Sequence, residues 1–165
     1  HLVPTEFMVA KIREAVAART DPDLLIVGRT NARRTQGIDE AIRRGEAFRN
    51  AGADMVFVYT RDADEMRRIG ERLGGPLVIF APEDGYADFP LTPADLAKLG
   101  YRLAASSGSA LAAMYKAVRQ SYEALAKGTI DPLLGRGGAV KEMKAAQKSA
   151  GLDRLLEIEK RTMAD

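Results

Sequence analysis

Leu24-Leu25-Ile26-Val27-Gly28-Arg29-Thr30-Asn31-Ala32 is a short apolar run that passes directly into an arginine, a threonine and an asparagine. Four apolar residues rich in branched side chains predict a strand over 24–27 that is covered on both of its faces. The polar residues then follow the carboxyl end of that strand, where parallel sheets open a crevice for ligands. We therefore expect an α/β fold with ligand contacts at this junction.

Arg29 is the first candidate for such a contact. An arginine can hold a carboxylate or phosphoryl group through two parallel hydrogen bonds, which a lysine meets only as a point charge. The alternative is an ordinary surface arginine that pairs with a neighbouring acid.

Downstream of this junction the chain repeats the alternation of helix and strand. Apolar runs predict strands over 55–58, 77–80 and 101–105, and periodic apolar positions predict helices over 4–19, 38–48, 62–73 and 92–99. Gly37 is expected to interrupt the chain before the second helix, and Gly52 to follow that helix as a left-handed cap. Parallel strands need crossovers of this kind. Either a small doubly wound sheet or half of an eight-stranded barrel satisfies this order.

The last third of the chain reads as helical. A long amphipathic helix is expected over 111–125, ending at Gly128, followed by two charged helical patterns over 140–147 and 152–163 that Gly151 separates. We expect one domain over 1–128 and a helical tail over 129–165. Apolar tail residues can cover either this chain's own barrel or a neighbouring subunit; they are Leu152, Leu155, Leu156 and Ile158.

Composition narrows the class of protein. The chain has 165 residues, 46% of them apolar, and its charged residues nearly cancel to +2, so neither nucleic acid nor a membrane is an expected partner. No run approaches the length of a transmembrane span, and the first residues lack a secretory layout, so a cytoplasmic protein is expected. With no cysteine and one histidine, any metal must be held by oxygen ligands. A dinucleotide site fails on spacing, because the first strand lacks the G-x-G-x-x-G turn.

Five segments in fixed succession resemble the isocitrate lyase and phosphoenolpyruvate mutase superfamily. They cover much of the stretch from Leu2 to Lys127, and they are residues 11–19, 28–32, 37–44, 51–57 and 99–102. The resemblance implies the carboxyl-terminal half of an eight-stranded (β/α)8 TIM barrel, strands five to eight, followed by helices that such enzymes exchange between subunits. It further implies a Mg²⁺-dependent enzyme that breaks or forms a C–C or C–P bond beside a carboxylate through an enolate. A homo-oligomer, dimer or tetramer, is then expected through the tail helices.

The resemblance also assigns roles to single residues. Arg29 matches the arginine that contacts the substrate's acid group, and Asn31 replaces an aspartate, as in the oxaloacetate decarboxylase-like branch. Tyr59 stands where the lyases carry a glutamate, and Phe80 where they carry an asparagine, so both depart from a true isocitrate or methylisocitrate lyase. Glu83 matches the family's strand-seven loop.

The family's magnesium-binding acids and its catalytic cysteine loop have no match in these residues, so the catalytic residues stay unassigned. His1, immediately before Leu2, resembles the end of that loop, or is a terminal leftover.

Other candidate substrate contacts follow the later strands. Ser106, Ser107, Gly108 and Ser109 offer hydroxyls and backbone N–H groups at a helix start, which attracts anions; Ser109 alternatively caps the helix. Tyr59 either donates to a substrate oxygen or packs, and Glu83 is either a supporting acid or a solvated loop carboxylate. The candidate substrate-binding residues are therefore Arg29, Asn31, Tyr59, Glu83, Ser106 and Ser109.

These residues support two classes of function. The first is a lyase or decarboxylase that cleaves a C–C bond of a small 2-oxo or 2-hydroxy carboxylic acid, with a C–P bond enzyme of the phosphonopyruvate type as its alternative. The second is a non-catalytic module that binds anions or takes part in assembly.

Overall fold

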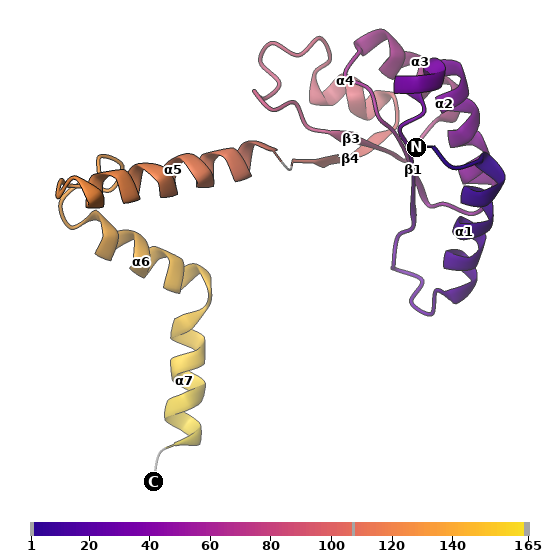
Figure 1. Cartoon of the computed structure of the whole chain (residues 1–165). Coiled ribbons are helices and arrows are strands. Elements are labelled where there is room, and N and C mark those ends of the chain that lie inside the picture. The colour runs from indigo at the N-terminus through magenta and orange to yellow at the C-terminus, as the bar shows by residue number, and fades with distance from the viewer. Residues whose placement is uncertain (1, 107, 164–165) are drawn as a thin grey trace. The chain divides into compact units, whose positions relative to one another are not determined.

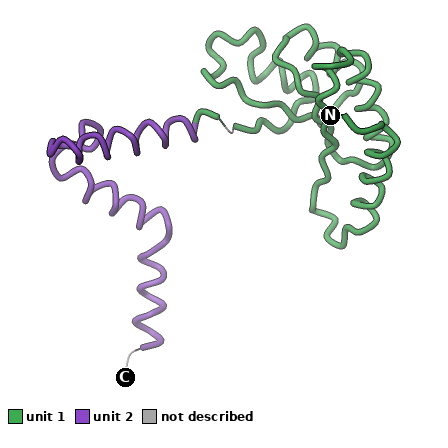
Figure 2. Tube along the Cα trace, in the orientation of Figure 1, with its two compact units in different colours: residues 1–109 green, residues 110–165 purple. Residues whose placement is uncertain are grey.

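The computed structural model describes residues 2–106 and 108–163, which form two compact units over residues 1–109 and 110–165 (Figure 2). His1 and Ser107, which the sequence analysis considered, lie outside the described residues.

The first unit alternates helices and strands along the chain (Figure 1). Its elements are α1 (Thr5–Ala18), β1 (Val27–Thr30), α2 (Arg33–Asn50), β2 (Met55–Val58), α3 (Ala63–Leu73), β3 (Leu77–Phe80), α4 (Pro93–Lys98) and β4 (Tyr101–Ala105). The four strands are parallel and follow one another in the order β1-β2-β3-β4. A doubly wound sheet reverses its strand order at a switch point, so this unreversed order favours half of a barrel.

The two faces of the sheet have different neighbours, because successive side chains on a strand point to opposite faces. One face packs against α2, α3 and α4 and forms the main core, to which β2 contributes Val56 and Val58 and β3 contributes Leu77 and Ile79. On the other face, Met55, Phe57 and Val78 form a smaller buried cluster with Tyr59 and Phe80. α1 packs on α2 through Ile12 and Phe48.

The first strand is shifted from its prediction. The strand expected over 24–27 with both faces covered is wrong: β1 begins at Val27, and Leu24 and Leu25 are each 59% exposed. β1 is an edge strand, and the register pairs Val27 with Met55, so the two leucines precede the sheet. An apolar run shows that a strand is near but not where its pairing begins.

Asp54 marks the start of that pairing. Its carboxylate accepts hydrogen bonds from the Ile26 backbone N–H at 2.8 Å and from Arg19 Nη1 at 2.7 Å. These contacts, the Ile26 bond first, hold the pKa of Asp54 below its ordinary value. The carboxylate thereby aligns the starts of β1 and β2.

Several local predictions are confirmed. Gly37 has φ 83° and interrupts the helical conformation near the start of α2, and Gly52 has φ 100° just after α2, conformations that glycine adopts without strain. The helix predicted over 92–99 is found as α4, whose start is fixed by a reciprocal capping box between Thr92 and Asp95.

The second unit consists of helices. α5 (Gly108–Ala126) begins in the first unit, and α6 (Gly138–Ser149) and α7 (Leu152–Thr162) follow, as the periodicity predicts. The apolar side chains of α5 are largely exposed, namely Leu111, Met114, Tyr115, Val118, Tyr122 and Leu125. Across the described residues, every helix is too short or too polar to cross a membrane.

Candidate active site

Polar side chains gather at the carboxyl edge of the sheet, because the carboxyl ends of parallel strands lie together. All six predicted substrate-binding residues lie in a strand or shortly after one. Arg29 lies in β1, and Asn31, Tyr59 and Ser106 come directly after β1, β2 and β4. Glu83 lies in the loop after β3, and Ser109 lies in the first turn of α5.

Arg29 lies against aromatic rings. Its guanidinium carbon is 5.0 Å from the centre of the Phe57 ring and 5.3 Å from that of Phe80, and its Nε donates to Asn31 Oδ1 at 3.3 Å. Phe57 and Phe80 meet edge to face at 4.9 Å. A cation over a ring face is attracted by the ring's quadrupole. The side chain is exposed, so it is oriented by the rings while remaining accessible to a ligand.

Arg29 and Asn31 share a pocket of about 380 Å³ with the start of the chain and with Arg44 of α2. Its lining is Leu2, Val3, Met8, Arg29, Thr30, Asn31, Arg44 and Phe48.

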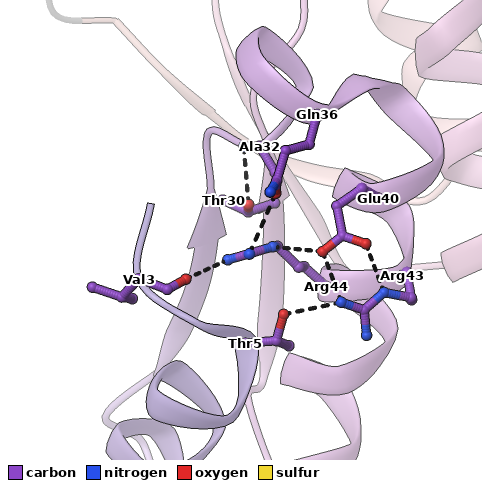
Figure 3. Close-up of polar contacts among 8 residues, drawn as sticks. All are labelled: Val3, Thr5, Thr30, Ala32, Gln36, Glu40, Arg43 and Arg44. Carbon is purple, nitrogen blue, oxygen red and sulfur yellow. Dashed lines mark hydrogen bonds and ion pairs between the residues drawn. The ribbon is translucent and has the colours of Figure 1, made fainter. Parts of the chain in front are cut away.

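Arg44 is a buried charge in this region, since only 7% of its side chain is exposed. Figure 3 shows its polar contacts. Its guanidinium donates to the Val3 carbonyl at 2.8 Å, to Glu40 Oε1 at 2.9 Å and to Gln36 Oε1 at 3.4 Å. A buried charge is tolerated when it is paired and hydrogen-bonded. Arg44 therefore ties the segment around Val3 to α2, beside the pocket that Arg29 lines. The sequence analysis missed this residue, since nothing in its spacing indicates burial.

Glu40 connects Arg44 to Arg43. Arg43 donates to Glu40 through Nε and Nη2, each at 2.7 Å, and also to Thr5 Oγ1 at 3.1 Å (Figure 3). The Arg43 hydrogen bond, supported by Arg44 and opposed by partial burial, lowers the pKa of Glu40 from 4.5 to about 2. The carboxylate is therefore ionised throughout the neutral range.

A second pocket, of about 210 Å³, lies between the ends of β2, β3 and β4. It gathers Tyr59, Glu83, Ser106 and Ser109, together with Arg61, Phe80, Ala81, Ala105 and Gly108. The Ser106 and Ser109 hydroxyls are 3.1 Å apart, and Ser109 lies inside the first turn of α5 rather than before it. The structure thus places the six predicted residues in two neighbouring pockets, and Phe80 connects them by lining the second pocket while its ring faces Arg29.

Arg61 is the residue of this second pocket that the sequence analysis missed. Its Nη2 donates to Glu83 Oε1 at 2.7 Å, and this carboxylate, with the nearby Tyr59 hydroxyl, raises the pKa of Arg61. A signal was available in the sequence. Phe57, Tyr59 and Arg61 are spaced two apart, so the alternation of β2 continues past its end and carries Arg61 to the same face.

No metal centre is visible in the residues described. Residues 2–106 and 108–163 contain no group of three or more histidine, aspartate or glutamate side chains placed to hold a metal ion. Glu83, one of the acids at the carboxyl edge, is instead paired with Arg61.

Comparison with known proteins gives consistent matches. A family model described as phosphoenolpyruvate phosphomutase matches residues 1–126. The chain is 34% identical over 159 residues to 2,3-dimethylmalate lyase of Eubacterium barkeri, covering 96% of this chain and 54% of that protein. It is 31% identical over 130 residues to oxaloacetate decarboxylase of Paraburkholderia xenovorans (strain LB400), covering 78% and 42%. The chain spans about half the length of these relatives.

Solved structures agree. The trigonal crystal form of 2,3-dimethylmalate lyase superposes with a TM-score of 0.81 at 28% identity, over 98% of this chain and 54% of that one. Phosphonopyruvate hydrolase in complex with oxalate and Mg²⁺ superposes with a TM-score of 0.66 at 26% identity, over 93% and 56%.

Proposed function

Because the chain belongs to the phosphoenolpyruvate mutase and isocitrate lyase superfamily, we propose that it supplies substrate-binding residues of a lyase or decarboxylase. The reaction we propose is cleavage of a carbon–carbon bond of a small 2-oxo or 2-hydroxy carboxylic acid. The family match over residues 1–126 confirms the predicted superfamily. The four parallel strands match about half of a TIM-barrel chain of this superfamily, which confirms the predicted fold class.

The observation that carries the proposal is the arrangement of Arg29. Its guanidinium is oriented by two rings and by Asn31, yet remains exposed at the carboxyl edge of the sheet. A planar, permanently charged fork held in this way suits a carboxylate, which it can meet through two parallel hydrogen bonds.

Hydroxyl groups near Arg29 can meet a second requirement of this chemistry, which is to stabilise the oxygen of the enolate. Cleavage beside a 2-oxo group leaves the bonding electron pair delocalised onto the oxygen of an enolate, and donors aimed at that oxygen lower the barrier. We assign such donation to the Tyr59 and Ser109 hydroxyls, which line the second pocket. A catalytic base is not assigned among the described residues.

We include magnesium dependence in the proposal for two reasons. The resemblance to the superfamily implies it, and the related phosphonopyruvate hydrolase was solved in complex with Mg²⁺. The described residues do not fit a magnesium site, because they contain no suitable group of acids. Ligands for the ion would have to come from other residues, and the roles assigned to Arg29, Tyr59 and Ser109 do not pass through it.

Calorimetry with oxalate tests this function on the intact protein. Oxalate resembles the enolate of a 2-oxo acid, so a lyase site should bind it more tightly with Mg²⁺ than without, and Arg29→Ala should weaken oxalate binding in both conditions. Oxalate affinity that changes neither with Mg²⁺ nor with the Arg29→Ala substitution would contradict the proposal.

A non-catalytic anion-binding module is the second candidate. It is favoured by the side chains at positions 59 and 80, where Tyr59 and Phe80 replace the lyases' glutamate and asparagine. Oxalate binding that needs Arg29 but is unaffected by Mg²⁺, with no turnover of oxaloacetate or phosphonopyruvate, supports this candidate. Turnover of phosphonopyruvate alone supports the C–P alternative.

We also propose that copies of this chain assemble into a homo-oligomer. Exposed apolar side chains along α5 and α7 support a homo-oligomer formed through these helices. A domain boundary at 128/129 and a cytoplasmic location stay predictions; the compact units divide at 109/110.

A further inference from the structure

Glu65 lies in the first turn of α3, which follows the carboxyl end of β2, and only 18% of its side chain is exposed. Arg33, at the start of α2, donates from Nε to both carboxylate oxygens of Glu65, at 3.1 and 2.9 Å. The hydroxyl of Thr60 donates to Oε2 of the same carboxylate. This one carboxylate therefore joins the segment after β1 to the segment after β2.

The contacts of Glu65 differ from those of an ordinary helix start. A glutamate at the third position of a helix often accepts the backbone N–H of the N-cap residue. Here the N-cap residue is Asp62, and its N–H donates to the Thr60 hydroxyl at 3.0 Å instead. Asp62 in turn caps the helix by accepting the Glu65 N–H at 2.9 Å. The Glu65 carboxylate is therefore available to bind Thr60 and Arg33.

Thr60 stands between two residues of the second pocket. It is buried, with 7% of its surface exposed, whereas Tyr59 and Arg61 on either side of it line the pocket. Successive side chains of an extended chain point to opposite sides. Holding the Thr60 side chain against Glu65 of α3 therefore fixes the direction in which Tyr59 and Arg61 point.

Arg33 extends this connection to the first pocket, the one of about 380 Å³. It lies two residues after Asn31, which lines that pocket. The Thr30 carbonyl accepts the Tyr59 backbone N–H at 3.2 Å, so the segments after β1 and β2 begin side by side. The ion pair between Arg33 and Glu65 then holds them together further along. Because Glu65 is partly buried, salt screens this pair less than a pair on the open surface.

From these contacts we infer that Glu65 is a positioning residue of the active site, which acts through Thr60 to hold the Tyr59 hydroxyl in place relative to Arg29. The inference rests on the proposed function, in which Arg29 binds the acidic group of the substrate and Tyr59 donates to the enolate oxygen. Such a donor lowers the barrier when it is already aimed before the reaction begins. Glu65 supplies this aim without touching the substrate.

Calorimetry with oxalate in the presence of Mg²⁺ tests the inference on the intact protein. Glu65→Gln removes the charge that pairs with Arg33, and Thr60→Val removes the hydroxyl while nearly keeping the shape of the side chain. Each substitution should weaken oxalate binding about fivefold, because small misplacements of a site group are costly. Thr60→Ser keeps the hydroxyl and should bind oxalate within about twofold of the wild type.

A double-mutant cycle separates positioning from a general loosening of the fold. Tyr59→Phe removes the hydroxyl on which Glu65 acts and should weaken oxalate binding about tenfold, the loss of one charge-assisted hydrogen bond. Adding Glu65→Gln to Tyr59→Phe should cause no further loss, because both substitutions remove the same interaction. A merely structural role of Glu65 would instead give additive losses.

Glu46→Gln is the matched control. Glu46 of α2 accepts a hydrogen bond from Arg72 of α3 at 2.8 Å, so this substitution also neutralises a carboxylate that joins the two helices. Glu46 lines neither of the two pockets, and its substitution should leave oxalate binding unchanged. Urea denaturation of each variant checks that oxalate is added to folded protein.

The outcomes separate the inference from the proposed function. If oxalate binds in a manner that depends on Mg²⁺ and Arg29, but Glu65→Gln leaves its affinity unchanged, the inference is overturned and the proposed function stands. The same holds if Glu65→Gln weakens oxalate equally in the wild-type and Tyr59→Phe backgrounds. If the wild-type protein does not bind oxalate, the proposed function fails and the inference fails with it.

Discussion

The guanidinium carbon of Arg29 lies 5.0 Å from the centre of the Phe57 ring, on the face of the sheet opposite the main core. Alternation along β2 directs Phe57 to that face, and the register that pairs Arg29 with Phe57 brings the two together. A charge that is otherwise free in solvent thereby acquires a defined orientation, which a substrate clamp requires.

Arg29→Lys tests whether the planar shape of the guanidinium contributes to oxalate binding in addition to its charge. Lysine keeps the charge but loses both the planar fork and its stacking on the rings, so we expect oxalate binding to weaken on the order of tenfold or more. Calorimetry measures the change, with Phe57→Leu as a comparison in which only a ring is lost and the effect is a few-fold. Equal binding by the lysine variant would show that the fork is not used.

Arg44→Met tests the buried network beside this site. The substitution leaves the Val3 carbonyl without its donor and removes one partner of Glu40, so we expect the free energy of unfolding to fall by about 2–3 kcal/mol. Arg43→Met, at a side chain 59% exposed, is the control and should cost less than about 1 kcal/mol. Urea denaturation monitored by circular dichroism gives both values. Similar losses in the two variants would contradict the assigned role of Arg44.

Glu40 makes the stability of the folded protein depend on pH. Folding lowers the pKa of this carboxyl from 4.5 to about 2, so the unfolded chain binds its proton first as the pH falls. The stabilisation from Glu40 is complete above about pH 5 and is lost progressively toward about pH 2. Denaturation of the wild type and of Glu40→Gln should therefore show a difference at pH 7 that narrows below about pH 5. A difference that stays constant down to low pH would count against the pairing.

The exposed apolar side chains of α5 provide a test of assembly. Leu125 is 73% exposed, and if the helix packs against another subunit, Leu125→Glu should place a charge in that contact and lower the mass found by sedimentation velocity. Lys116→Gln makes the same change in net charge at a polar position of the helix and should leave the mass unchanged. An unaltered mass in the Leu125 variant would remove α5 from the interface.

Most of the helices and strands were predictable because their causes are local. Apolar spacing produces the buried faces of α2 and α3, and Thr92 with Asp95 caps α4. The start of β1 was not predictable in this way. Leu24 and Leu25 have a composition typical of strands, but the sheet begins after Ile26. The backbone N–H of Ile26 donates a hydrogen bond to Asp54, which lies some thirty residues later in the chain.

The candidate site was likewise predictable from the sequence only in part. The amino-acid sequence alone was sufficient to predict the parallel α/β order and the place of the candidates at the strand ends, because these follow from short-range patterns, and the superfamily was predicted from the resemblance of five segments to that family. Only the tertiary structure joined Arg61 to Glu83, stacked Arg29 on Phe57 and Phe80, and separated the six candidates into two pockets. Those pairings join residues on different strands, and strand register and packing determine which side chains meet, which no local pattern encodes.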